Sequence, residues 1–346
     1  MKELIAKLKE TGNLTKAEWI TLIDGRNEEL SQYLFSQSRK KAQEYYGKDI
    51  YIRGLIEISN YCKNNCFYCG IRKGNKEVIR YHLSKTEILD CCRRGYEVGF
   101  RTFVLQGGED DFYSDEVLVD IIKTIKTKYP DCAVTLSIGE REYQSYKALY
   151  NSGADRYLLR HETFNSAHYR KLHPGNLTAE HRQMSLRNLK KIGFQTGSGF
   201  MVGSPYQTTE NIAEDMLFIK DLNPEMVGIG PFIPHHSTVF AHEPQGTLEL
   251  TLFIIGLLRL MNPRLLLPAT TALGTICPQG RIKGILAGAN VVMPNISPVD
   301  LRKNYELYDN KIYSGNESGE DLKKLKEEIQ SIGYEVKVAK GDYIKE

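Results

Sequence analysis

Three cysteines lie within eight residues of one another and form a set that could bind a metal centre. Cys62, Cys66 and Cys69 follow the spacing C-x3-C-x2-C, and the chain has only four other cysteines. Thiolates are soft ligands that select zinc, copper(I) or iron–sulfur clusters. A structural zinc site takes four ligands, commonly as two separated pairs, and no second pair stands at such a spacing here. A cubane cluster normally has one thiolate per iron, so a triplet leaves one iron open. The triplet therefore favours a cluster with an open iron over half a zinc site or a chance grouping of thiols.

A glycine-rich stretch, LQGGED at residues 105–110, is the second place where chemistry is expected. Gly107 and Gly108 have no side chain, so the backbone can come close to a ligand there. Many turns between a strand and a helix contain such a pair, so the stretch alone is a weak signal. Its meaning depends on its position relative to the cysteine triplet.

The elements that position these two motifs alternate between strand and helix. Strands are predicted at 51–59, 101–106, 133–139, 155–162, 194–203, 226–232, 265–271 and 290–294. Helices are predicted between them at 84–99, 114–129, 141–153, 179–193, 208–222, 249–261 and 280–289. Strict alternation argues for a parallel sheet, and eight such units favour a (β/α)8 TIM-type barrel over an open doubly wound sheet. The triplet then follows the first strand and LQGGED ends the second, at the edge where barrels carry their active sites.

The chain divides into three expected parts. Residues 1–50 have apolar side chains at helical spacing and predict a helical extension before the barrel. The barrel is expected to occupy residues 51–300, without an internal linker. Residues 301–346, with a charged helix and a short strand, are expected to close the barrel.

Composition limits the class of protein. The chain has 346 residues, 41% of them apolar and 26% charged, with a formal net charge of +3. These values are typical of a globular protein and too mild to indicate a nucleic-acid or membrane partner. The first residues lack the apolar core of a signal peptide, and seven cysteines without an export signal fit a reducing compartment. A cytoplasmic location is therefore expected.

The cysteine motif, with Tyr68 directly before Cys69, resembles the signature of the radical S-adenosylmethionine (SAM) superfamily. This resemblance implies one 4Fe–4S cluster on Cys62, Cys66 and Cys69, whose open iron is chelated by the amino and carboxylate groups of SAM. It further implies that the reduced cluster splits SAM to give a 5′-deoxyadenosyl radical. LQGGED matches the element of that superfamily that holds the SAM amino group.

Longer blocks are similar to a narrower family, the radical SAM maturases of FeFe-hydrogenase (HydE). They are IRGLIEISNYCKNNCFYCGIR, LQGGED, GADRYLLRHET, MVGIGPFIPH and PATTALGT, and the similarity extends to about residue 310. The resemblance implies a full barrel around an internal cavity. The SAM-site residues that it implies are Tyr68, Gln106, Gly107, Gly108, Glu109, Thr135, Ser137, Glu162, Arg182 and Met201. The substrate residues that it implies are Arg156, Arg160, Met226, Thr270, Thr271 and Tyr305.

Several of these residues have ordinary interpretations without the resemblance. Thr135 and Ser137 suit any strand, Met201 suits a core, and Arg182 on a helix flank would be solvated. Arg156 and Arg160 are four residues apart on a predicted strand and share a face, because side chains alternate with a period of two. Inside a barrel they would need an anionic partner. His161, His235 and His236 are interpreted as structural.

The family resemblance also implies a reaction. Its substrate is a small iron complex that carries cysteine, carbon monoxide and cyanide, delivered by a partner maturase, and the radical acts at the cysteine sulfur. Expected partners are other hydrogenase maturases and a reducing electron donor. Methylornithine synthase and biotin synthase are the alternatives within the superfamily, and an iron–sulfur electron carrier or zinc-stabilised binding protein is the alternative outside it. Many relatives have a second cysteine triplet near the C-terminus, whereas NKIYSGNESGEDLKK contains no cysteine, so no accessory cluster is expected there.

Overall fold

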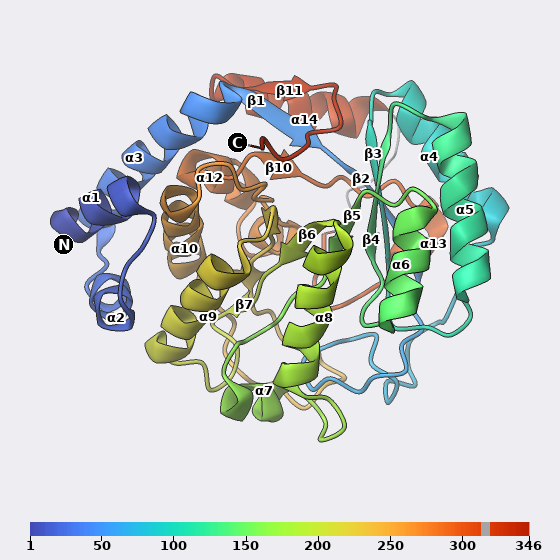
Figure 1. Ribbon diagram of the computed structural model, residues 1–346, viewed down its shortest axis with the longest axis horizontal. Coiled ribbons are helices and arrows are strands. Elements are labelled where there is room, and N and C mark those ends of the chain that lie inside the picture. Colours follow the sequence, from blue (N-terminus) through green and yellow to red (C-terminus); the bar gives the residue numbers. More distant parts are fainter. Residues whose placement is uncertain (313–318, 346) are drawn as a thin grey trace.

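Three helices precede the barrel. The computed structural model describes residues 1–312 and 319–345. Helices α1 (Lys2–Thr11), α2 (Lys16–Asp24) and α3 (Glu28–Tyr46) lie outside the strands and next to α9, α10 and α12 (Figure 1). Thr15 and Glu18 form a capping box at the start of α2, which fixes where that helix begins. The helical pattern expected for the first 50 residues is thus present.

Six strands form a continuous parallel sheet in the order β2-β3-β4-β5-β6-β8. Their bounds are β2 Gly54–Ser59, β3 Thr102–Gly107, β4 Ala133–Ser137, β5 Arg156–Leu158, β6 Gln195–Ser198 and β8 Met226–Val227. Short strands β7 (Met201–Val202) and β9 (Gly230–Pro231) pair with each other beyond the ends of β6 and β8. All of these pairings are parallel, as the alternation of elements predicted.

Parallel bridges close this sheet into a barrel. Met226 bridges to Leu266, and Pro268 bridges to Val291 in β10 (Val291–Val292). Asn295 bridges back to Leu55 in β2, and the amide of Leu55 donates to Pro294 O at 2.9 Å. The ladder therefore runs round to its starting strand, and the fold is the predicted (β/α)8 barrel.

Helices cover the outside of the strands (Figure 1). Their bounds are α4 Lys85–Glu97, α5 Asp115–Lys128, α6 Tyr143–Asn151, α7 Ser166–Leu172, α8 Ala179–Ile192, α9 Thr209–Leu222, α10 Leu248–Met261, α11 Thr271–Ile276 and α12 Gly280–Ala287. Ser84 and Glu87 form a capping box at the start of α4, which fixes where that helix begins. Gly193 ends α8 with φ 110°, a left-handed conformation that favours glycine.

The largest differences from the prediction are at the carboxyl ends of the strands. The predicted strand 155–162 forms a continuous ladder only to Leu158, and beyond it Glu162 makes one isolated bridge to Phe200. The predicted strand 265–271 has isolated bridges only, because Thr270 is the N-cap of α11 and Thr271 is its first residue. Helices α7 and α11 were not predicted, since both are short and follow loops without an amphipathic pattern. These chain segments bend into the active-site end instead of continuing as strands.

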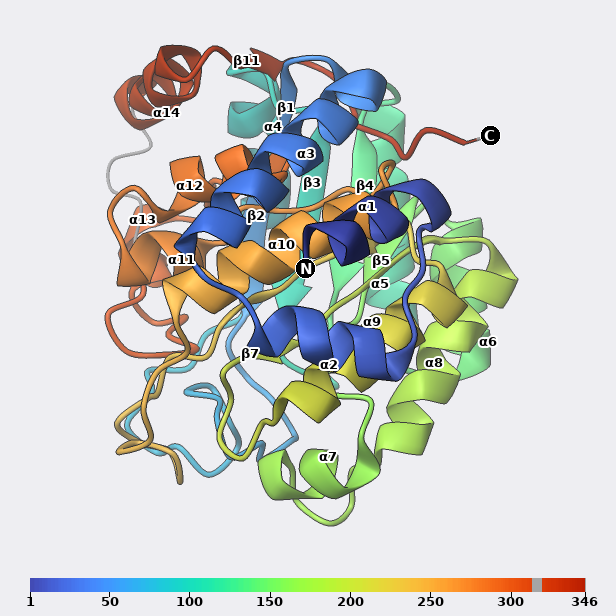
Figure 2. The ribbon, with the colours of Figure 1, turned by 90° about the vertical axis from the view of Figure 1, so that its left-hand side faces the viewer.

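The C-terminal segment contacts both ends of the barrel. Helix α13 (Val299–Arg302) leads to residues 303–312, part of which lines the cavity described below. Helix α14 (Gly319–Ser331) is followed by β11 (Glu335–Lys337), which pairs with β1 (Asp49–Ile52). Figure 2 shows β11 at the opposite end of the molecule from α7 and the pale blue loop that contains the cysteines. The tail therefore covers the amino ends of the strands. The domain boundaries at 50 and 300 stay predictions.

No helix in the described ranges is both long enough and apolar enough to cross a membrane.

Candidate active site

The carboxyl ends of the barrel strands surround a cavity of about 340 Å³. This volume lies within the range of small-molecule sites. Sixteen of the residues expected at the cluster, SAM and substrate sites line the cavity. They are Cys62, Cys66, Tyr68, Cys69, Gln106, Gly107, Gly108, Glu109, Ser137, Arg160, Glu162, Arg182, Met201, Thr270, Thr271 and Tyr305.

The cysteine triplet lies in the loop that follows β2. All three thiols are free, and the loop is anchored where the amide of Lys63 donates to Glu109 O at 2.8 Å. Burial, and secondarily Cys62, raises the pKa of the Cys69 thiol to about 12. Burial also raises the pKa of the Cys66 thiol well above its ordinary value, and the neighbouring thiols add to the rise. Three thiolates cannot coexist here without a cation, so this donor set fits a metal cluster.

Gly108 joins the two motifs. A Cβ on Gly108 would lie 2.2 Å from Tyr61 O and 2.6 Å from the Cβ of Cys62. The glycine at this position is therefore required by close contact between the end of β3 and the cysteine loop. Sequence reasoning assigned the glycine pair to ligand approach, whereas at Gly108 the close neighbour is protein.

Arg182 holds two carboxylates at the rim of the cavity. Its Nε donates to Glu140 Oε1, its Nη2 lies 3.8 Å from Glu109 Oε1, and its Nη1 donates to Arg160 O at 3.1 Å. The backbone amide of Glu140 also donates to Glu109 Oε1 at 3.0 Å. Arg182 is thus buried and paired, unlike the solvated residue that its helix position alone suggested. Glu140 was missed, because nothing in the sequence links it to residues over 30 positions away.

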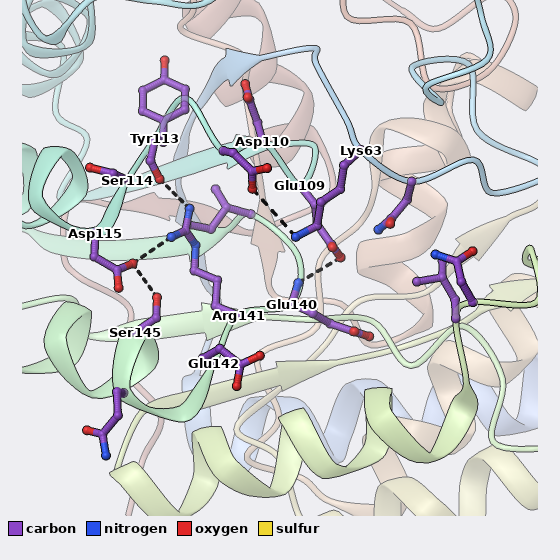
Figure 3. A pocket seen from close by; sticks show the side chains of 16 residues that line it. Lys63, Glu109, Asp110, Tyr113, Ser114, Asp115, Glu140, Arg141, Glu142 and Ser145 are labelled. Atoms are coloured by element: carbon purple, nitrogen blue, oxygen red, sulfur yellow. Dashed lines mark hydrogen bonds and ion pairs between the residues drawn. The ribbon is translucent and has the colours of Figure 1, made fainter.

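An open cleft of about 630 Å³ adjoins this rim and reaches Glu109 from outside. Figure 3 shows Glu109 beside Glu140, with Arg141 next to Asp115. Arg141 Nη1 donates to Asp115 Oδ1 at 2.8 Å, and Ser145 Oγ donates to the same oxygen at 2.5 Å. These contacts fix the loops after β3 and β4, and through them they fix the position of Glu109.

Glu162 has an unusual backbone. Its φ is 63°, in the left-handed region that non-glycine residues rarely adopt, and its side chain is largely buried. Strained residues of this kind cluster at ligand sites. Its Oε2 lies 3.1 Å from Nη2 of Arg160, and both residues line the cavity.

Several buried polar atoms of the cavity wall have no hydrogen-bond partner in the described part of the chain. They include Nε and Nη2 of Arg160 and Oγ1 of Thr270. Arg160 Nη2 is close enough to Glu162 for an ion pair, but the two atoms lack hydrogen-bond geometry. Thr270 is the N-cap residue of α11, yet its hydroxyl does not cap the helix. Unsatisfied donors of this kind are costly unless a ligand or water satisfies them, so they mark a polar binding region.

Arg156, Thr135 and Met226 do not line this cavity, contrary to the roles that the resemblance implied. Arg156 shares a strand face with Arg160, as predicted, but it lies four residues nearer the amino end of the barrel. Its Nη2 donates to Asp342 Oδ1 at 2.5 Å and to Lys340 O at 2.9 Å, so its anionic partner is the C-terminal tail.

Thr135 and Met226 lie at a depth in the barrel similar to that of Arg156. Thr135 pairs in register with Arg156, whereas Ser137, two residues further along β4, reaches the cavity. The sulfur of Met226 contacts Nη1 of Arg53 at 3.0 Å, and its side chain packs on Leu266. Two residues along a strand span about 6.6 Å, and this distance separates the level of Thr135 from that of Ser137 at the cavity.

We expect substitution of Arg156 by methionine to lower stability rather than to affect chemistry. The change removes five hydrogen bonds, to Asp342, Lys340, Gly341, Thr102 and Gln195. Because Asp342 is half-exposed and water can replace its partner, we expect the free energy of unfolding to fall by only about 2 kcal/mol. Urea titration of the apoprotein measures this fall. Unchanged stability together with lost turnover would return Arg156 to the substrate site.

The histidines have acidic partners that sequence reasoning did not find. His161 is fully buried, 2.8 Å from Ser198 Oγ and 3.3 Å from Asp215 Oδ1, away from the cavity lining. His235 and His236 lie near Asp309, and His236 Nδ1 is 2.7 Å from its Oδ1. The rings of His235 and His236 are stacked with centroids 4.3 Å apart, so their nitrogens cannot both point at one ion in their ring planes. We assign no metal to this group.

Cys91 and Cys92 are not among the residues that line the cavity. Both lie on the buried face of α4 with no exposed area. They belong to the hydrophobic core and are not candidate ligands.

The comparisons with known proteins agree with the fold and with the motifs. Residues 56–219 match the Radical SAM superfamily, and the chain is a radical SAM enzyme that uses S-adenosylmethionine. The [FeFe] hydrogenase maturase subunit HydE of Thermotoga maritima is 42% identical over 311 residues, which are 90% of this chain and 88% of that protein. The chain therefore belongs to the HydE family.

One further relative and two solved structures are also similar to this chain. The 3-methylornithine synthase of Methanosarcina acetivorans is 27% identical over 95% of this chain and 92% of that protein. A solved structure of methylornithine synthase matches with a TM-score of 0.84 and 26% identity over 96% of this chain and 97% of the other. The hydrogenase maturase HydG has the same fold, with a TM-score of 0.80 and 21% identity over 96% of this chain and 74% of that one.

Glu109 provides a direct test of the expected SAM site. Glu109→Gln keeps an oxygen to accept the amide of Glu140 but removes the negative charge. A charge-assisted hydrogen bond is worth about 1.5–3 kcal/mol, so we expect the Kd of SAM to rise by about 10- to 100-fold. Iron content should be unchanged. Equilibrium binding of SAM to the reconstituted protein measures the change, and a Kd equal to that of the parent would remove Glu109 from the SAM site.

Proposed function

We propose that this protein acts in the assembly of the [FeFe]-hydrogenase active site, as a radical SAM enzyme whose substrate is a small iron complex carrying cysteine, carbon monoxide and cyanide. The observation that supports this most is the 42% identity to the Thermotoga maritima maturase over 90% of the chain. The cavity behind the cysteine loop, with its unsatisfied cationic and hydroxyl donors, suits a small polar anion.

The cysteines and Glu109 have distinct roles in this proposal. Cys62, Cys66 and Cys69 would hold a 4Fe–4S cluster by three thiolates and leave one iron open for SAM. When bound and reduced, that cluster would supply the one-electron chemistry that cleaves SAM into methionine and a 5′-deoxyadenosyl radical. Glu109, fixed by Glu140 and Arg182, binds the SAM amino group.

Other residues orient the remaining parts of the two ligands. Tyr68, whose hydroxyl lies 3.1 Å from His173 Nε2, packs beside the adenine. Ser137, Glu162 and Met201 complete the SAM site, with Gln106 and Gly107 along the methionine. Arg160, Thr270, Thr271 and Tyr305 bind the substrate above it. Exclusion of water from this cavity during turnover would keep the radical from reacting unproductively.

Partners and location follow from this proposal. A second maturase would deliver the iron complex, another would receive the product, and an external reductant would supply the electron. We place these events in the cytoplasm.

Methylornithine synthesis from an amino acid is the second candidate. Its support is the 0.84 TM-score and 26% identity to the methylornithine synthase structure, with nearly complete coverage of both chains. Biotin synthase has weaker support, because no cysteine follows β3, β5 or β6 to hold a second cluster.

Substrate-dependent SAM cleavage separates the two candidates. The reconstituted protein is given SAM, dithionite and either single amino acids, supplied one at a time, or a small iron complex that carries cysteine, carbon monoxide and cyanide. We expect 5′-deoxyadenosine to rise above the uncoupled rate only with the iron complex. Faster cleavage with an amino acid, together with methylornithine in the mixture, would favour the second candidate.

A further inference from the structure

A buried ion pair lies on the cavity wall and is not part of the sites described above. Nζ of Lys311 is 2.5 Å from Oε1 of Glu57, and the two side chains are 7% and 0% exposed. Glu57 points inward from β2, the strand that leads into the cysteine loop, and Lys311 belongs to the C-terminal segment. Both residues line the same cavity as the cysteines.

The hydrogen bonds of this pair leave one donor of Lys311 for a ligand. The ammonium group has three donors, and Lys311 uses one on Glu57 and one on Tyr305 O at 2.7 Å. Within the described ranges no third hydrogen-bond acceptor contacts it, and the ammonium group lies 4.7 Å from the centroid of the Tyr305 ring. Both carboxylate oxygens of Glu57 already accept a hydrogen bond, because Oε2 accepts from Asn295 Nδ2 at 2.8 Å. The pair therefore presents a donor, rather than an acceptor, to the cavity.

Stability alone does not explain the pair. Removing two charges from water costs several kcal/mol, and a buried ion pair is often no more stabilising than apolar side chains of the same size. A lysine whose carboxylate partner fixes it on a cavity wall is instead well suited to bind an anion. Glu57 offsets the cost of the buried ammonium while no ligand is present.

Arg160, the second cationic side chain of the cavity, lies at a different position around the barrel from Lys311. Glu57 is on β2, and Arg160 follows β5, three places along the order β2-β3-β4-β5 of a closed eight-stranded ring. Arg160 also has a carboxylate neighbour, Glu162, and two of its buried nitrogens have no hydrogen-bond partner among the described residues. The cavity thus has two separate cationic donors, each next to its own carboxylate.

We propose that Lys311, positioned by Glu57, is a second anion-binding group opposite Arg160, and that the cavity selects ligands with two separated acceptor groups. A small molecule with a carboxylate at one end and another anionic acceptor at the other fits this arrangement. The inference rests on the proposed function only in taking this cavity as the substrate site. It adds a residue and a substrate feature that the family resemblance did not supply.

Binding of simple carboxylates tests the inference without any turnover. The reconstituted protein with SAM bound is titrated calorimetrically with succinate, which has two carboxylates, and with acetate, which has one. We expect succinate to bind more tightly than acetate, and Lys311→Met to weaken succinate by at least about tenfold through loss of a charge-assisted hydrogen bond. The affinity for acetate should fall by less, because Arg160 still binds its carboxylate.

Matched variants separate this role from a structural one. Lys311→Arg keeps a cation and should restore succinate binding to within about threefold of the parent, by retaining the charge-assisted contact. Lys323→Met removes an exposed lysine of α14 and should change neither binding nor iron content. If Lys311→Met fails to retain iron, Lys311→Gln, which keeps a hydrogen-bond donor, replaces it.

Two outcomes would overturn the inference. One is equal succinate affinity in the parent and in the folded Lys311 variants, and the other is equal affinity of the parent for succinate and acetate. Failure of the maturase proposal would look different, since succinate binding would keep its dependence on Lys311 while no hydrogenase was activated.

Discussion

Replacing any one of Cys62, Cys66 or Cys69 by alanine should remove both the cluster and SAM cleavage. The three thiols lie in one loop and line one cavity, and the described ranges offer no fourth cysteine there. A cubane with three protein ligands cannot keep its shape on two, so iron should fall from about four per chain to below about one. Iron analysis after anaerobic reconstitution and assay of 5′-deoxyadenosine measure the two effects.

Cys277→Ala is the matched control for this prediction. Cys277 is partly exposed and follows α11, so its loss disturbs neither the core nor the loop. This variant should keep about four irons and full SAM cleavage. Cys91 and Cys92 are poorer controls, because both are fully buried and their replacement would leave cavities in the core. An iron content near six or eight in the parent would contradict the single cluster.

Replacing Arg160 by methionine should almost abolish product formation. In the described part of the chain, two of its guanidinium nitrogens are buried in the cavity wall without a hydrogen-bond partner, although Nη2 is also 3.1 Å from Glu162 Oε2, and we expect both to donate to the substrate. Loss of two charge-assisted hydrogen bonds costs about 3 kcal/mol or more, so kcat/KM for product should fall at least about 100-fold. Because Arg160 also neighbours Glu162, SAM cleavage should fall as well, though by much less. The ratio of product to 5′-deoxyadenosine, followed by chromatography, is the quantity to measure.

Arg160→Lys is the informative comparison for this variant. Lysine restores the charge but not the planar pair of donors, so it should recover only part of the coupling. If Arg160→Met keeps the ratio of product to 5′-deoxyadenosine of the parent, the substrate does not bind this side of the cavity. Substrate binding would then have to rest on Lys311, Thr270, Thr271 and Tyr305.

The barrel and its catalytic end could be predicted because they depend on local signals. The capping box of Ser84 and Glu87, the C-cap at Gly193 and the alternation of strands with helices are each readable within a few residues. The two motifs end adjacent strands, β2 and β3, so their meeting follows from the order of the strands.

What could not be predicted depends on contacts between distant parts of the chain. The shared face of Arg156 and Arg160 is a local property, but the partner of Arg156 is Asp342, 186 residues away. Glu57 and Lys311 are 254 residues apart. A charged residue inside the buried strand GLIEIS was nevertheless a signal, because such a charge requires a partner.

The most direct test of the proposed function is activation of an apo-[FeFe] hydrogenase in a defined mixture. The mixture contains the other maturases, SAM and reductant but no HydE-type protein, and hydrogen evolution is measured after the reconstituted chain is added. We expect hydrogen evolution that depends on SAM and that is lost with Cys66→Ala. Absence of hydrogen evolution, from protein that has a full cluster and cleaves SAM, would contradict a role in hydrogenase maturation.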